Sequence, residues 1–218
     1  MTSRRRPRLA GRVLGAAGLA AAVGAIALLA TGYTTATVNG DAMDPTYPRG
    51  DRVFFERIDA DEVRRGDVVL HRTEDRYENR PVLRRVIGMG GDHVRQIPGG
   101  PVTVNGRTLT EPYVKDGDPS GPAPAYDVLV PEGRLFLLGD HRANSNDSRF
   151  SLDAQSGSIA ATTVQARALD NNRGLLLLAL TALFGLLGTA GGLAMEIASR
   201  VSRRASRSPH PPAPSARG

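Results

Sequence analysis

The sequence predicts a mostly β, antiparallel domain held between two transmembrane helices. Long apolar runs lie within residues 13–31 and 173–198 of the 218-residue chain. Between them, short apolar runs are separated by Gly, Pro and Asp, and no stretch keeps a helical period. A chain of this length has room for one compact domain of about 140 residues in addition to membrane segments.

The first apolar run follows a basic N-terminus, and no residue from 13 to 40 is charged. A helix over residues 13–30 rises about 27 Å, close to the hydrocarbon thickness of about 30 Å. A cleaved secretory signal peptide is the alternative, because basic, apolar and small residues occur in that order. The uncharged run is longer than the apolar part of a usual signal peptide, so we expect a membrane helix over residues 13–31.

The second apolar run, residues 174–195, carries no charge and includes four consecutive leucines. It is long enough to span a bilayer by itself, and its length and composition disfavour a buried helix of a soluble domain. Gly188 and Gly192 form a small-xxx-small pair that lets helices approach closely. Such glycines are also common in membrane helices, so the sequence alone assigns them no role.

Basic residues flank both apolar runs on their outer sides, and the formal net charge is +6. Nucleic-acid binding is a rival explanation, but each cluster adjoins an apolar run, which is typical of a membrane flank. The positive-inside rule predicts cytoplasmic ends, residues 1–12 and 199–218, and an extracytoplasmic domain, residues 32–172. The two clusters consist of Arg4, Arg5, Arg6, Arg8 and Arg12, and of Arg200, Arg203, Arg204 and Arg207.

This orientation predicts the result of a reporter-fusion experiment. A reporter fused after Gly157 should be external, and one fused at Gly218 should be cytoplasmic. The reason is that one span lies on each side of the domain, between it and a basic, cytoplasmic end. Compartment-specific enzyme reporters measure both positions. Detection of the two reporters on the same side would mean that one span is misassigned.

The middle domain contains several short runs typical of strands, at residues 52–55, 67–70, 81–83, 93–97 and 135–138. The clearest turn is Asn105-Gly106, because Asn-Gly tolerates the positive φ angles of a type I′ hairpin turn. A hairpin is therefore expected over residues 102–109. The chain has no cysteine, which excludes disulfides and thiol chemistry, and we expect neither a metal nor a cofactor.

Residues 40–46 read Gly-Asp-Ala-Met-Asp-Pro-Thr. They resemble the motif of type I signal peptidases, in which a nucleophilic Ser directly precedes Met-x-Pro-Thr. Ala42 occupies the nucleophile position, and a methyl group cannot attack a carbonyl. The family's general base is a Lys that opens a Lys-Arg-x-x-Gly-x-x-Gly-Asp run, and the matching run here begins at Arg84. An arginine stays protonated at any working pH and cannot accept a proton from a hydroxyl.

The resemblance extends over most of residues 38–169. Residues 48–53 and 65–69 are similar to the family's two Gly-Asp strands, and residues 84–92 match the base-bearing run except at Arg84 and at Gly90, where the family usually has Pro. Residues 139–149 closely match the signature Gly-Asp-x-Arg-x-x-Ser-x-Asp-Ser-Arg. The resemblance implies an antiparallel β domain that rests on the membrane and cleaves signal peptides after small residues.

The same resemblance implies a role for individual residues. Ser145 matches the Ser that orients the base, and Asp147 and Arg149 match a pair that braces the loop. Substrate contacts are expected from three residues around the nucleophile position, Asp41, Met43 and Pro45. Asp41 or Asp44 as a substitute nucleophile is disfavoured because a side chain one or two residues from the nucleophile position is aimed differently. His141 as a substitute base is disfavoured because family members vary at that position and no nucleophile is evident.

These substitutions favour a catalytically impaired signal peptidase homologue of the protein-export pathway. It would bind signal peptides or a membrane partner protein and would contact membrane lipid, with no nucleic acid involved. An active signal peptidase with an atypical catalytic arrangement is the alternative, and a structural membrane protein without a peptide groove is a third. Turnover of a signal-peptide substrate separates the first two.

Overall fold

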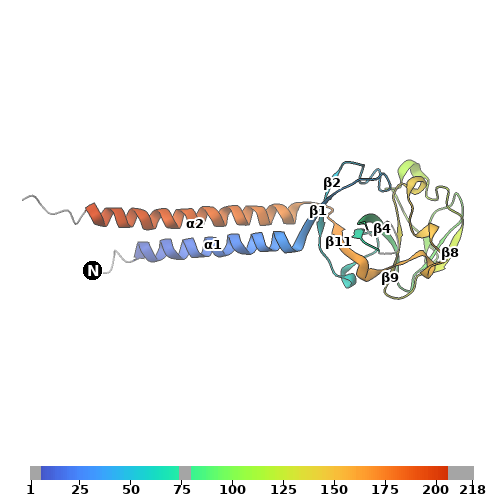
Figure 1. Ribbon diagram of the computed structural model, residues 1–218, viewed down its shortest axis with the longest axis horizontal. Helices are drawn as coiled ribbons and strands as arrows, with labels where there is room; N and C mark the ends of the chain where they lie inside the picture. The colour runs from blue at the N-terminus through green and yellow to red at the C-terminus, as the bar shows by residue number, and fades with distance from the viewer. Residues whose placement is uncertain (1–5, 74–79, 206–218) are drawn as a thin grey trace, which may run out of the picture. The chain divides into compact units, whose positions relative to one another are not determined.

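The computed structural model describes residues 6–73 and 80–205, which form two separate units (Figure 1). One unit contains α2 (Arg173–Ala205) and α1 (Arg6–Gly32) as far as Ala30. The other, Thr31–Asn172, contains every strand. The prediction of a mostly antiparallel β domain with two long apolar helices is confirmed.

Both helices are long and apolar enough to cross a membrane, over Leu9–Gly32 and Arg173–Ser202. Their large apolar side chains are mostly exposed; Leu177 and Phe184, for example, are 66% and 65% exposed. A continuous apolar surface of this kind is costly in water and is typical of a surface that faces lipid. The helices are therefore consistent with a membrane-anchored protein.

The two helices lie side by side in antiparallel directions, and glycines line their contact (Figure 1). A Cβ atom on Gly18 would come within 2.5 Å of the Gly185 carbonyl oxygen, and one on Gly192 would come equally close to that of Gly11. Thr189 donates a hydrogen bond to the Gly15 carbonyl, at 3.3 Å. The absence of side chains at these glycines thus lets the two backbones approach closely.

We expect Gly18→Val to separate the helices, because the added side chain meets backbone atoms that cannot move aside. The absence of cysteine permits a direct measurement with Gly11→Cys and Met195→Cys, whose Cβ atoms would lie about 3.3 Å apart, near disulfide distance. Oxidation should give an intramolecular disulfide that is largely lost when Gly18→Val is added. Gly24→Val is the control, since nothing lies within 4 Å of a Cβ there; equal yields in both would contradict the contact.

The β unit contains two antiparallel sheets. The larger has seven strands in the order β1-β2-β11-β3-β4-β9-β10, and the smaller has four in the order β7-β6-β5-β8. β1 is therefore an edge strand of the larger sheet. The strands are β1 (Tyr33–Thr37), β2 (Arg52–Glu56), β3 (Val68–His71), β4 (Val82–Met89), β5 (His93–Gln96), β6 (Thr103–Val104), β7 (Arg107–Thr108), β8 (Tyr126–Leu129), β9 (Arg134–Leu138), β10 (Ile159–Ala160) and β11 (Val164–Ala168).

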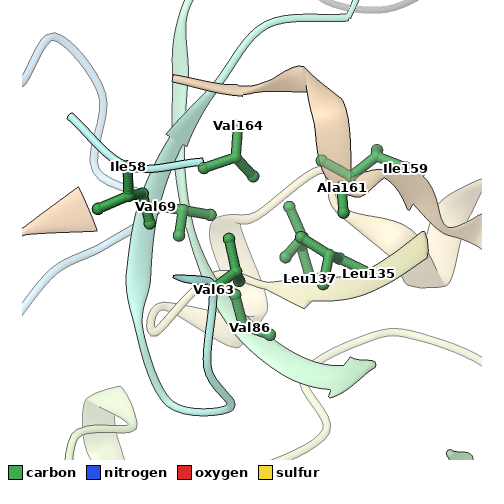
Figure 2. Packing of buried hydrophobic residues seen from close by; sticks show 9 residues of the cluster. All are labelled: Ile58, Val63, Val69, Val86, Leu135, Leu137, Ile159, Ala161 and Val164. Atoms are coloured by element: carbon green, nitrogen blue, oxygen red, sulfur yellow. The ribbon is translucent and has the colours of Figure 1, made fainter. Parts of the chain in front are cut away.

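Alternation along the strands divides the core of the larger sheet between its two faces. On β3, Val69 points into one cluster, and the preceding Val68 points into another. Figure 2 shows the first cluster, whose nine side chains gather between the surrounding strands. The second cluster includes Met43 and Phe55 and lies on the face where the nucleophile motif is found. A third cluster fills the space between the two sheets.

The Asn-Gly hairpin forms where it was predicted. Asn105 and Gly106 have φ angles of 52° and 75° and connect β6 to β7. On β4, consecutive side chains point to opposite faces and serve different clusters: Val86 packs in the first and Ile87 in the third. The register of β4 against β9 shifts between Val86 and Gly88. β4, which carries the base-bearing run, thus contributes side chains to both the first and the third cluster.

Candidate active site

The nucleophile motif lies in the loop between β1 and β2. The Ala42 carbonyl accepts a hydrogen bond from the His141 amide at 3.0 Å, which joins this loop to the signature loop after β9. Met43 is buried, and its carbonyl accepts from the Tyr47 amide at 2.8 Å. Ala42 is therefore held on a well-anchored turn.

Arg84 lies near the start of β4, paired in register with Val69 of β3. Its side chain is 7% exposed. The guanidinium donates to the Leu83 carbonyl at 2.7 Å and to the Asn146 carbonyl at 2.9 Å. The second bond connects the base position to the signature loop, and both bonds fix the direction of the side chain.

Ala42 and Arg84 line the same cavity, which measures about 490 Å³. This volume lies within the usual range of ligand pockets, about 300–1,000 Å³. The walls are mostly apolar, with Arg80 and Arg84 as their charged members, and come from four strands, the nucleophile loop and the residues just before β4. They include Ala36 of β1, Phe55 of β2, Leu70 of β3, Leu83 of β4 and Met43.

Of the three residues expected to contact substrate, the cavity wall includes one, and the substrate contacts themselves stay a prediction. Asp41 and Pro45 are not among the residues that line the cavity, whereas Met43 is. Asp41 forms a two-bond ion pair with Arg49, with both N–O distances at 3.0 Å. Pro45 is exposed. The apolar wall therefore continues from Met43 along β1 and not toward the acidic side of the motif.

Ser145 is buried behind the nucleophile loop, with 5% of its surface exposed. A Cβ atom on Gly139 would overlap both Ser145 Oγ and the Ala42 carbonyl oxygen, so a side chain at position 139 would displace one of these groups. Ser145 Oγ makes no hydrogen bond to any residue that the structure describes. The expected hydrogen bond from Ser145 to the base position is therefore not made, and Arg84 donates instead to the carbonyl of the next residue, Asn146.

The signature loop is braced by an ion pair that is fully shielded from water. Arg149 donates to Asp147 at 2.7 and 2.8 Å, and both side chains are 0% exposed. Arg149 also donates to the carbonyls of Ser120 and Arg142. The Arg149 side chain thus connects the signature loop to the loop that contains Ser120.

A second ion-pair network lies beside Arg84, and the sequence reasoning did not identify it. Arg85 donates two bonds to the buried Asp140, at 2.6 and 2.8 Å, and its guanidinium lies 3.8 Å from the centre of the Tyr113 ring. Thr46 donates to the same carboxylate. Burial raises the pKa of Tyr113, and the neighbouring Glu111 raises it further. Thr46, Arg85 and Asp140 lie in matched motifs, which was the available signal.

The two aspartates of the nucleophile loop that flank Ala42 are also paired. Lys115 forms an ion pair with Asp44, and this hydrogen bond raises the pKa of Lys115. The bond from Arg49 lowers the pKa of Asp41. His141 Nδ1 lies 3.2 Å from the Asp41 carbonyl oxygen. Lys115 is thus kept protonated, and the two carboxylates are held in ion pairs.

Comparisons with known proteins show that this chain is similar in sequence to signal peptidases. Signal peptidase I of Bacillus licheniformis is 36% identical over 121 residues, covering 51% of this chain and 63% of that protein. Signal peptidase I of Leptolyngbya laminosa is 36% identical over 124 residues, covering 52% and 58%. Signal peptidase I S of Bacillus subtilis is 32% identical over 122 residues, covering 51% and 64%. The chain therefore spans less than two thirds of the length of these relatives.

A crystal structure of a signal peptidase I from Enterococcus faecalis aligns with 49% of this chain and 96% of its own, at 24% identity and a TM-score of 0.39. The family described as "Signal peptidase, peptidase S26" matches residues 11–169, which include the nucleophile loop, the base position and the signature loop. The chain belongs to the signal peptidase family, peptidase S26.

Proposed function

We propose that this protein is a membrane-anchored signal peptidase homologue that binds signal peptides without cleaving them. The observation that carries the proposal is the presence of Ala42 and Arg84 on the wall of one apolar cavity. A cavity with these walls can hold an apolar segment of a peptide. The nucleophile and the general base that cleavage requires are replaced by Ala42 and Arg84.

The chemistry of a Ser/Lys dyad requires a hydroxyl and an amine that can lose its proton. Ala42 supplies no nucleophilic atom, and the guanidinium of Arg84 cannot act as a base. Lys115 contacts the nucleophile loop through its ion pair with Asp44, and this pair raises the pKa of Lys115. A general base needs a lowered pKa, so Lys115 is not suited to that role. Loss of a nucleophile alone usually costs several orders of magnitude in rate.

Binding is supported by the edge of the larger sheet. The cavity wall includes residues 36–40, at the end of edge strand β1 and in the loop that follows it. An exposed strand edge can pair with an extended peptide through backbone hydrogen bonds, while side chains enter an adjacent pocket. The end of a signal peptide, with small side chains, suits such a groove. A membrane partner protein with an extended apolar segment is the other occupant that fits this surface.

The test combines a cleavage assay with crosslinking. Purified full-length protein should give no cleavage of an Ala-x-Ala precursor above background, in conditions where an active homologue processes it. A photoreactive group at the end of the same signal peptide should crosslink to the cavity. Ala36→Phe, which fills the cavity, should reduce crosslinking, whereas Leu129→Phe on the smaller sheet should not.

Two results would contradict the proposal. Turnover that persists in the wild-type chain and is abolished by changing a residue other than Ala42 or Arg84 would support an active peptidase with an atypical arrangement. Crosslinking that is equal in the Ala36→Phe and Leu129→Phe variants would show that the cavity does not hold the peptide.

A further inference from the structure

We infer that the cavity selects a peptide end with a free C-terminal carboxylate, bound by Arg84, over an uncleaved chain. This inference rests on the proposed function and specifies its ligand. The ligand class is an apolar peptide that ends in small residues and a carboxylate, which is the chemical form of a signal peptide after cleavage.

The first support is the position of a permanent charge. Arg84 is 7% exposed, and together with Arg80 it lies on the wall of a cavity whose other side chains are largely apolar. Electrostatic attraction is stronger where water is excluded, and a guanidinium matches the two oxygens of a carboxylate. The bonds to the Leu83 and Asn146 carbonyls orient the side chain and leave its formal charge unchanged.

The second support is where that charge lies relative to the nucleophile position. In a peptidase of this family the attacked carbonyl carbon must lie next to the nucleophile, which corresponds to Ala42 here. Cleavage turns that carbonyl into the terminal carboxylate of the released peptide. Because Ala42 and Arg84 line the same cavity, a peptide seated along β1 would bring this carboxylate toward the guanidinium.

The third support is the charge balance of the surroundings. Asp41 and Asp44, the acidic residues that flank the nucleophile position, form ion pairs with Arg49 and Lys115. Their negative charges are therefore offset locally, and they oppose an incoming carboxylate less than isolated aspartates would. An uncleaved chain offers a neutral amide at the same position, so the guanidinium would gain only a weaker, neutral hydrogen bond.

The experiment compares two peptides that differ at a single group. A fluorescent signal-peptide fragment that ends in Ala-x-Ala is prepared with a free carboxylate and with a C-terminal amide. Binding to the full-length protein in detergent micelles is measured by fluorescence anisotropy. We expect the carboxylate form to bind about tenfold more tightly, equivalent to about 1.4 kcal/mol. Arg84→Gln should remove this preference, Arg84→Lys should retain part of it, and Arg95→Gln, at an exposed residue of β5, should leave it unchanged.

The outcomes separate the inference from the proposed function. Equal binding of the two peptides to the unaltered protein would overturn the inference and leave peptide binding intact. Binding of neither peptide would contradict the proposed function itself. A preference for the carboxylate that survives in Arg84→Gln would also overturn the inference, because another group would then be responsible. The comparison on the unaltered chain requires no variant to fold.

Discussion

Asp147→Ala is expected to lower the free energy of unfolding of the β domain by about 3–5 kcal/mol. The reason is that Arg149 would remain as a buried cation without its carboxylate partner; both side chains are 0% exposed. The change would also remove the acceptor of the Gly139 amide, at 3.1 Å. Loss of these bonds should loosen the signature loop on which Ser145 lies.

Urea unfolding of the full-length protein in detergent measures this effect. The five tyrosines lie between positions 33 and 126, and the chain has no tryptophan, so tyrosine fluorescence reports on the β domain and not on the helices. Asp127→Ala is the matched control, because Asp127 pairs with His93 and, at 3.7 Å, with Arg95, and its side chain is 55% exposed. Exposed pairs contribute about 0–1 kcal/mol. An equal, small loss in both variants would show that the buried pair does not stabilise the fold.

The strands that the sequence predicted share a simple local signal. β2, β5 and β9 are short apolar runs bounded by turn residues, and the hairpin has the Asn-Gly pair that its turn geometry requires. β1 was not predicted because Tyr33–Thr37 continues the uncharged run of the preceding helix, and only pairing with β2 identifies it as a strand. β11 depends in the same way on its long-range pairing with β2 and β3.

The sequence could predict which residues belong to the site, but it could not predict which of them contact one another. Motif order identified Ala42 and Arg84, and the structure adds that the two line one cavity. The sequence could not indicate that Arg84 donates to the Asn146 carbonyl, because the longer guanidinium reaches a group that a lysine amine need not reach. Nor could it pair Lys115 with Asp44, since 71 residues separate them. Both contacts depend on how separate loops meet.

Restoring the dyad gives the prediction with the largest expected effect on activity. Ala42→Ser combined with Arg84→Lys should raise signal-peptide cleavage at least about 100-fold over the unaltered chain, the lower end of what a general base contributes. Each single variant should stay near background. A serine beside Arg84 has no base, and a lysine beside Ala42 has no nucleophile to activate. Cleavage of an Ala-x-Ala precursor, followed by mass spectrometry of the product, measures all four proteins.

The structure gives a reason to expect recovery in the double variant and a reason to expect it to be partial. Ser145 Oγ is buried beside the Ala42 carbonyl and makes no hydrogen bond to the described residues, so it is available to an introduced amine. Arg84→Lys also removes the bond to the Asn146 carbonyl that holds the present side chain, and a shorter lysine must find its own position. A lysine acts as the base only where burial lowers its pKa, which depends on that position. Ser145→Ala in the double variant should therefore abolish most of the recovered rate, and an unchanged rate would show that Ser145 does not orient the lysine.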